Sequence, residues 1–327
     1  MAQQWFPGMS LGEFELIERY FTGRGAVRDD VRLSVGDDAA IVTPRAGAEL
    51  VLALDTIVAD VHFPADTGSR FVGHRALAVN LSDLAAMGAE PAWALLGLTL
   101  PAADESWLAG FASGFDELAR RFGVALVGGD TTRGPLAATV TVGGWVPVGE
   151  ALTRSGARHG DDLWVSGTTG DAGAGLAILQ ARLAAGGAIR EELLRRFLLP
   201  EPRVDLGRSL RGIADACIDI SDGLAGDLAK LCRASGVGAR LDCARLPRSP
   251  QLLESAGEVA SMRLALTAGD DYELLFTAPP ASRRRIEELA AATPVSLIGE
   301  ITAAPGIHLQ GAGLERDLVH GFDHFTD

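Results

Sequence analysis

The sequence predicts an α+β protein made of two domains. Its 327 residues exceed the roughly 150 residues of a typical single domain, and a hydrophobic content of 47% is ample for packed cores. Short apolar segments of strand character alternate with longer segments in which apolar residues recur at helical spacing. We place the domain boundary near Glu150, so that residues 1–150 form one domain and residues 151–327 the other.

The N-terminal domain is expected to begin with an amphipathic helix over residues 12–21. Strand character follows at Val35 and at residues 40–42, interrupted by Gly36-Asp37-Asp38. Because Asp and Gly are poor strand formers, this triplet predicts a turn or a bulge. The other helices expected here cover residues 70–88 and 104–122, and the other strands cover residues 49–55, 93–100, 124–127 and 137–147.

The C-terminal domain shows the same mixture of elements. Its expected strands and helices cover residues 161–166, 216–220, 274–278 and 295–298, and residues 203–214, 224–234 and 282–291, respectively. Ser221 or Asp222 is in place to cap the helix that begins at Leu224. A glycine-rich run over residues 167–175 lacks the Gly-Lys-Ser/Thr of a phosphate-binding P-loop, so it predicts a closely packed strand-to-helix hinge.

The net charge of −14 argues against nucleic acid and anionic membranes as partners. An acidic protein that binds a polyphosphate needs either a local cluster of basic residues or bound divalent cations. Lysine cannot supply such a cluster, because Lys230 is the only lysine in the chain.

The sequence predicts a cytoplasmic protein. No apolar run reaches the roughly 18 residues that span a bilayer, and the N-terminus has neither the basic start nor the apolar core of a signal peptide. Cys217, Cys232 and Cys243 are odd in number and lack ligand spacing, which is typical of small buried residues in a reducing compartment.

The helix around residues 78–91 carries polar residues beside its apolar stripe. Leu77, Leu81 and Leu84 lie at helical spacing, and Asp83 lies next to this stripe. An ionised carboxylate is costly to bury unless a positive group meets it. One Asp on one amphipathic helix would ordinarily face water, but other carboxylates occur at the ends of neighbouring elements.

Those carboxylates recur in short turns that contain Gly, Ser or Thr. Asp38 lies in the predicted turn, Asp55 ends an apolar strand of the buried type, and Asp130 follows two glycines. Glycines at a strand end let backbone N–H groups approach an anion closely. Asp219 and Asp222 are three residues apart at a strand-to-helix turn, where both could serve one cation.

This set of oxygen donors is compatible with Mg²⁺. The ion prefers one or two carboxylates together with water and substrate phosphates. Zinc is not expected, because no Cys or His set has ligand spacing, and an EF-hand loop is absent. Several Mg²⁺ ions would reverse the local field and let an acidic protein hold ATP, so the spacing allows a phosphate-transferring enzyme without proving one.

The motifs VGDDAA, LALDTIVADVHF, ALAVNLSDLAAMGAEPAW, LVGGDTTRGPL, ISDGLAGDL, AGDDYEL and GFDHF occur in this order. Together they resemble the thiamine-monophosphate kinases, a family of the aminoimidazole ribonucleotide synthetase superfamily, over nearly the whole chain. The resemblance implies the two-domain fold of that superfamily: an N-terminal mixed sheet with helices that dimerises, and a C-terminal α+β sandwich. It also implies ATP-dependent phosphorylation of thiamine monophosphate to thiamine diphosphate, with several Mg²⁺ ions.

The resemblance also implies roles for individual residues. The implied metal ligands are Asp38, Asp55, Asp83, Asp130, Asp219 and Asp222, with a possible main-chain ligand at Leu54. The implied ATP-binding residues are Gly129, Asp130, Arg154 and Ser221, and those for the thiamine substrate are His62, Asp270 and Phe322. This chain differs from the family in having Ala53-Leu54 for Ser-Thr, Asp270 for Glu and Phe322 for Tyr.

The acceptor in such a reaction is a phosphate monoester that is already largely dianionic at neutral pH, because its second pKa is about 6. No general base and no covalent phosphoenzyme are therefore expected. Two alternatives stay open at this point. One is another ATP-dependent enzyme of the superfamily that acts on a ribonucleotide amide, and the other is a metal-binding scaffold without catalysis.

Overall fold

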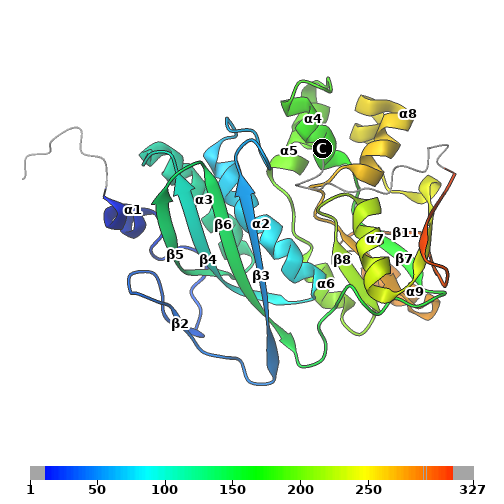
Figure 1. The fold of residues 1–327 in the computed structure, drawn as a ribbon, viewed down its shortest axis with the longest axis horizontal. Helices are drawn as coiled ribbons and strands as arrows, with labels where there is room; N and C mark the ends of the chain where they lie inside the picture. The colour runs from blue at the N-terminus through cyan, green and yellow to red at the C-terminus, as the bar shows by residue number, and fades with distance from the viewer. Residues whose placement is uncertain (1–11, 290, 292, 312–327) are drawn as a thin grey trace, which may run out of the picture. The chain divides into compact units, whose positions relative to one another are not determined.

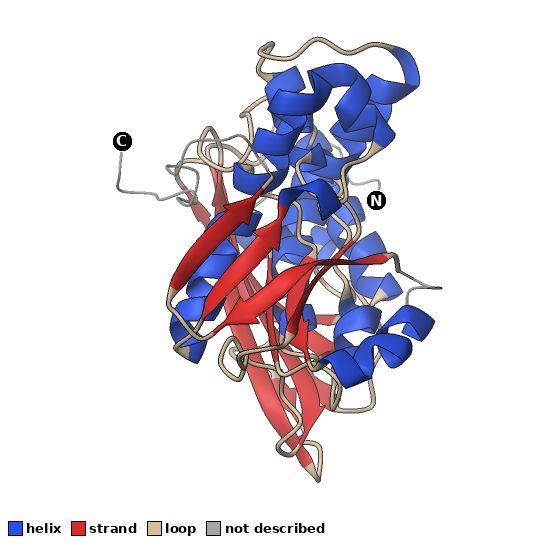
Figure 2. Ribbon diagram, turned by 90° about the vertical axis from the view of Figure 1, so that its right-hand side faces the viewer, coloured by secondary structure: helices blue, strands red, loops and turns tan. Residues whose placement is uncertain are grey.

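The computed structural model describes residues 12–289, 291 and 293–311 (Figure 1). Contacts between backbone segments divide the chain into two units. The first unit contains Met1–Arg45, Leu54–Leu77 and Ala92–Val142, and the second contains Ala46–Ala53, Ala78–Pro91 and Gly143–Asp327. Strands and helices occur throughout the described chain (Figure 2), which confirms the α+β class.

A four-stranded sheet has the order β3-β6-β4-β5. Its strands are β3 (Ala48–Val58), β4 (Glu90–Leu100), β5 (Ala125–Arg133) and β6 (Ala137–Pro147). Two short strands, β1 (Val31–Leu33) and β2 (Ile41–Val42), pair antiparallel. The predicted break between them is confirmed, because Gly36 adopts a φ of 117° and turns the chain there.

The prediction for β3 was wrong in two respects. The strand continues three residues past Asp55 to Val58, and it is not buried: Leu50, Leu52 and Leu54 are 45%, 58% and 58% exposed. Successive side chains point to opposite faces of a strand, so these three leucines share one face. A continuous apolar run cannot be distinguished from a fully buried strand by periodicity, which explains the error.

Three helices accompany this sheet: α1 (Glu13–Tyr20), α2 (Ser69–Ala86) and α3 (Glu105–Arg121). The Asp104 carboxylate caps α3 by accepting hydrogen bonds from the backbone N–H groups of Ser106 and Trp107, at 2.8 and 3.1 Å. Glycines let α2 and α3 approach closely. A Cβ added at Gly73 would lie 2.0 Å from the Phe111 carbonyl oxygen, well inside van der Waals contact.

The second unit contains a six-stranded sheet of order β12-β9-β11-β7-β10-β8. Its strands are β7 (Asp162–Ser166), β8 (Ala216–Asp219), β9 (Gly238–Asp242), β10 (Leu274–Ala278), β11 (Val295–Thr302) and β12 (Gly306–Gln310). Apart from the parallel pair of β9 and β12, neighbouring strands in this sheet run antiparallel. Leu163, Ile218 and Leu275 on adjacent strands contribute to its main core.

The helices of this unit are α4 (Asp171–Leu179), α5 (Gly187–Leu198), α6 (Val204–Leu210), α7 (Leu224–Ser235), α8 (Pro250–Thr267) and α9 (Arg283–Leu289). Helix α7 contributes Leu228 and Leu231 to the core of the sheet. Helices α4, α5 and α8 lie together in Figure 1 around a smaller core that includes Ile178, Leu193 and Leu252.

The three cysteines are buried and unpaired, as predicted. Burial raises the pKa of the Cys232 thiol to about 11, which keeps it protonated at neutral pH. Among the described residues, none of the helices combines the length and the apolar character needed to cross a membrane.

We predict that Gly73→Ala lowers the free energy of unfolding by about 1–3 kcal/mol, the usual cost of overpacking. The added methyl group meets the backbone of α3, so the two helices have to move apart. Denaturant unfolding measures the change. Gly97→Ala is the control, because an added Cβ there meets its nearest atoms, those of Thr139, at an ordinary contact distance of 3.7 Å. Equal stability of the two variants would contradict the close packing of α2 and α3.

Candidate functional site

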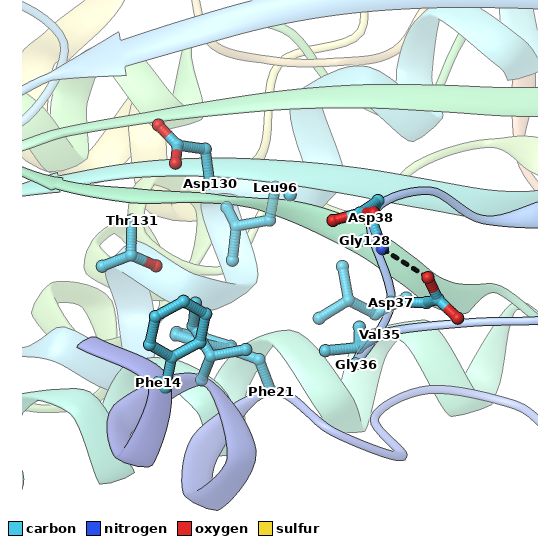
Figure 3. A pocket seen from close by; sticks show the side chains of 13 residues that line it. Phe14, Phe21, Val35, Gly36, Asp37, Asp38, Leu96, Gly128, Asp130 and Thr131 are labelled. Atoms are coloured by element: carbon cyan, nitrogen blue, oxygen red, sulfur yellow. Dashed lines mark hydrogen bonds between the residues drawn. The ribbon is translucent and has the colours of Figure 1, made fainter. Parts of the chain in front are cut away.

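The first unit contains a cavity of about 500 Å³ with one aromatic wall and one acidic wall (Figure 3). Phe14 of α1 and Phe21, which follows that helix, form the aromatic wall. In Figure 3 their rings lie below Asp130 and Thr131, and Asp37 and Asp38 lie at the other end of the cavity. An aromatic surface and charged oxygen atoms therefore line one space that is large enough for a small-molecule ligand.

The Asp37–Asp38 pair projects from the turn at Gly36. The backbone N–H of Asp38 donates to the Asp37 carboxylate at 2.8 Å, which fixes the first side chain against the turn. Both residues are exposed. Exposed carboxylates can accept a hydrated cation without a large desolvation cost, which is how Mg²⁺ usually binds.

Asp130 lies within β5 and not at a bend beyond it. The predicted strand over residues 124–127 was too short, because β5 continues to Arg133 in parallel pairing with β4. The register shifts between Ala94 and Leu95, so one extra residue of β5 is accommodated as a bulge before the glycines. The glycines and aspartate that suggested a strand end are tolerated inside the strand because of this irregularity.

Gly129 permits a close approach of two backbones. Its φ is 154°, and an added Cβ would lie 1.9 Å from the Leu96 carbonyl oxygen. Only glycine fits here without moving β4. The next residue, Asp130, is exposed and stands opposite Gly97 on β4, where no side chain covers its carboxylate from that neighbour.

Asp55 and His62 lie on or just after β3. Asp55 is half-buried inside the strand, and it is not among the side chains that line the cavity. The backbone N–H of Val58 donates to Nδ1 of His62 at 3.1 Å. Since Nδ1 accepts this hydrogen bond, a neutral His62 carries its proton on Nε2, and that nitrogen is a donor.

In the second unit, the helical segment with Asp83 is joined to the end of β8. Ser82 is fully buried, and its hydroxyl donates to the Asp219 carboxylate at 2.8 Å. Asp219 is the last residue of β8 and only 4% exposed, so its predicted place at a strand end is confirmed. The next residue along the helix, Asp83, is half-buried.

Asp222 is held by a lysine. Lys230 of α7 contacts the Asp222 carboxylate and lies 2.8 Å from the Asp227 carboxylate. The prediction that Ser221 or Asp222 caps α7 was wrong. The Asp227 carboxylate instead turns back and accepts both of their backbone N–H groups, each at 3.0 Å.

This acidic and basic cluster shows how a carboxylate is tolerated in a nearly buried place. Burial raises the pKa of Asp227, and the hydrogen bond and charge of Lys230 oppose that rise. Sequence reasoning noted Lys230 but missed its role. The only signal for it was the spacing of three residues between Asp227 and Lys230, which brings two side chains together on a helix.

The remaining expected ligand residues lie in the second unit or outside the described residues. Arg154 is exposed, and Ser221 and Asp270 are half-buried. The backbone N–H of Asp270 donates to the Ser221 carbonyl at 2.9 Å, so these two residues are directly joined. Phe322 lies outside the described residues.

In the first unit, Asp38 and Asp130 line the same cavity at different ends, and in the second, Asp83 follows Ser82, whose hydroxyl binds Asp219. Within the part of the chain that the structure describes, no three His, Cys, Asp or Glu side chains form a ready-made metal cluster. The chemistry of the donors still fits Mg²⁺, which takes few protein carboxylates and completes its shell with water and substrate phosphates. A closed cage of protein ligands is not required for that ion.

The sequence matches two described families. These are the AIR synthase related protein N-terminal domain, over residues 36–146, and the AIR synthase related protein C-terminal domain, over residues 158–312. The thiamine-monophosphate kinase of Escherichia coli K12 is 44% identical, over 97% of this chain and 99% of that protein. That of Caulobacter vibrioides is 40% identical, over 89% of this chain and 84% of the relative.

Solved structures agree with these relationships. A crystal structure of thiamine-monophosphate kinase from Stenotrophomonas maltophilia K279a superimposes with a TM-score of 0.83 at 47% identity, covering 88% of this chain and 93% of that one. The structure described as AaThiL complexed with AMPPCP and TMP gives a TM-score of 0.77 at 32% identity, with coverage of 89% and 92%. The hydrogenase maturation protein HypE of E. coli, at 24% identity and a TM-score of 0.69, shares the fold. The chain belongs to the thiamine-monophosphate kinase family of AIR synthase related proteins.

Proposed function

We propose that this protein transfers the γ-phosphate of ATP to the phosphate of thiamine monophosphate, giving thiamine diphosphate and ADP. The main support is the full-length similarity to thiamine-monophosphate kinases at 44% identity. A relative of the same fold is described as a complex with AMPPCP and TMP, so one protein of this family holds both ligands at once. The motifs that predicted the family contain the carboxylates described above.

The difficulty of this reaction is electrostatic. Both reactants are phosphate anions, and the protein itself carries a net charge of −14. Bound Mg²⁺ supplies the positive charge that lets donor and acceptor phosphates come into line. We assign the holding of these ions to Asp38, Asp55, Asp83, Asp130, Asp219 and Asp222, with the Leu54 carbonyl as a possible further ligand.

The protein's own residues bind and orient the two substrates. We assign nucleotide binding to Gly129, Asp130, Arg154 and Ser221, and contacts with the thiamine substrate to His62, Asp270 and Phe322. The close packing of Gly129 against the Leu96 backbone supports its part, because it fixes the backbone next to Asp130, and both residues line the cavity. The accepting phosphate is already ionised, so no side chain has to remove a proton.

The replacement of Ser-Thr by Ala53-Leu54 leaves main-chain oxygens as the donors at these positions. Leu54 turns its side chain to the exposed leucine face of β3, and Asp55 lies on the other face. Side-chain ligation from residues 53–55 therefore depends on Asp55 alone. We propose that the protein keeps its metal sites despite this replacement, because Mg²⁺ accepts water in place of a hydroxyl ligand.

We further propose that the protein is a homodimer and acts in the cytoplasm. β3 is an edge strand of its sheet, and three of its leucines are exposed on one face. Apolar side chains that gather on an exposed edge are typical of association surfaces. The buried, unpaired cysteines suit a reducing compartment.

An ADP-release assay with and without thiamine monophosphate tests the reaction, and Asp83→Asn tests the role of the carboxylates. We expect ADP release only with the acceptor present. Loss of an outer-shell metal partner already costs about 10- to 100-fold, so loss of a ligand in Asp83→Asn should lower kcat by at least about 100-fold with the fold intact.

Asp205→Asn is the matched control, because this side chain is 92% exposed and should leave turnover unchanged. ADP release that depends on a ribonucleotide amide instead of thiamine monophosphate would overturn the proposed activity. Normal formation of thiamine diphosphate by Asp83→Asn at saturating Mg²⁺ would overturn the metal-holding role.

The dimer is tested by the double variant Leu50→Glu, Leu52→Glu. Placing two charges on the exposed apolar face of β3 should convert a dimer into a monomer, as measured by sedimentation equilibrium. Val259→Glu is the control, because Val259 is also an exposed apolar residue, at 73%, but belongs to α8 and not to β3. A dimer that survives the double substitution would exclude this face as the interface.

A further inference from the structure

The loop between α8 and β10 has an unusual backbone. Asp270 and Tyr272 adopt positive φ angles of 70° and 51°, although neither is a glycine. Such conformations are disfavoured for residues with a Cβ, and each costs on the order of 1 kcal/mol or more. They persist only where the surroundings over-determine the backbone, so some part of the structure must hold this loop in place.

Backbone hydrogen bonds join the loop to the end of β8. The N–H groups of Asp270 and Tyr272 donate to the carbonyls of Ser221 and Ile220, at 2.9 and 2.8 Å. The Ile220 N–H donates back to the Glu273 carbonyl at 2.8 Å. Ser221, assigned to the nucleotide, and Asp270, assigned to the thiamine substrate, therefore lie on two hydrogen-bonded backbone segments. One segment cannot move without the other.

The acidic side chains within the loop differ in burial. Asp271 is 4% exposed, and its carboxylate accepts the Gly170 N–H at 2.6 Å, at the start of α4. Glu273 is fully buried. Asp270 remains half-buried, and its carboxylate accepts the Tyr272 hydroxyl at 3.1 Å. The two buried acids fix the loop to the rest of the unit, and Asp270 is the acid that stays partly accessible to a ligand.

Glu273 is the strongest of these anchors. Arg203 binds its carboxylate with two parallel hydrogen bonds, at 2.6 and 2.5 Å, and Arg196 of α5 adds a third at 2.9 Å. The Ser166 hydroxyl donates to the same carboxylate at 2.6 Å and accepts the Leu274 N–H at 2.9 Å. These contacts come from three separate segments of the chain.

Keeping the buried Glu273 carboxylate ionised has an energetic cost. Burial raises the pKa of Glu273, but the hydrogen bonds and charges of Arg203 and Arg196 outweigh it and leave the pKa below its ordinary value. Gly167 has a φ of 57°, and a Cβ there would lie 2.1 Å from the carboxylate. Since a buried ion pair is often no more stabilising than apolar side chains of the same size, stability alone does not account for this arrangement.

We propose that Glu273, held by Arg203, Arg196 and Ser166, is a positioning residue that sets Asp270 and Ser221 in register for the two substrates at once. The inference rests on the proposed function of those two residues. Its specific consequence is that a change in Glu273 weakens the binding of both substrates. A change in Asp270 itself weakens the binding of thiamine monophosphate only.

The test measures two dissociation constants by calorimetry, one for thiamine monophosphate and one for AMPPCP, in the presence of Mg²⁺. In Glu273→Gln both should rise by about tenfold, within the range expected when a remote change misplaces binding groups. In Asp270→Asn only the constant for thiamine monophosphate should rise. Arg203→Lys keeps the charge but loses the paired hydrogen bonds, so it should resemble Glu273→Gln and decides the matter if that variant does not fold.

Arg283→Gln is the matched control. It also breaks two hydrogen bonds from an arginine to a nearly buried carboxylate, those to Asp162 at 2.6 and 2.7 Å. Asp162 pairs with Ala278 at the end of β10 opposite to the one that the loop joins. Both dissociation constants should stay unchanged in this variant. If Asp270→Asn binds thiamine monophosphate normally, the proposed substrate site fails. If Asp270→Asn is impaired but Glu273→Gln and Arg203→Lys bind both ligands normally, only the positioning role fails.

Discussion

Repulsion between like charges is the constraint on which this structure depends. Two phosphate compounds have to approach within bonding distance on a protein whose net charge is −14 and which contains a single lysine. In water such repulsion is weakened by the solvent, but it grows as water is excluded. The carboxylates near the cavity would increase this repulsion unless cations bind to them. In the proposed function, divalent ions bound to these carboxylates remove that repulsion.

The two units handle negative charge differently. Asp37 and Asp38 are exposed beside the cavity of the first unit, where water already solvates them. In the second unit, buried or nearly buried acids are each met by a donor: Asp219 by Ser82, Asp227 by Lys230, and Glu273 by two arginines. A buried carboxylate without such a partner would be destabilising. The exposed acids are suited to exchangeable hydrated ions, and the buried ones to fixed geometry.

Much of the fold could be predicted from the sequence, because strand and helix periodicity is local. The strands β7, β8 and β10 and the helix α7 lie close to where the pattern placed them. Errors arose where neighbours in space decide the outcome. The exposed face of β3 and the continuation of β5 past its glycines both depend on pairing within the sheet. Helix α8 was missed, and Gly257 inside it has a φ of 72°.

The candidate site could be predicted only in part. The aspartates and Gly129 were visible as motifs, because they lie in short stretches of sequence. The anchoring of Glu273 was not visible, since Ser166, Arg196 and Arg203 are distant from it along the chain. Likewise, the sequence did not indicate that Asp227 accepts the backbone N–H groups of Ser221 and Asp222, just before α7.

A crystal structure of this protein with AMPPCP, thiamine monophosphate and Mn²⁺ tests the central claim most directly, because anomalous scattering locates each Mn²⁺ ion independently of the model. The account predicts several ions between the two sets of phosphate oxygens, with Asp38, Asp83, Asp130 and Asp219 among their ligands. Ordered ligands whose phosphates meet without any ion bound to these carboxylates would contradict it.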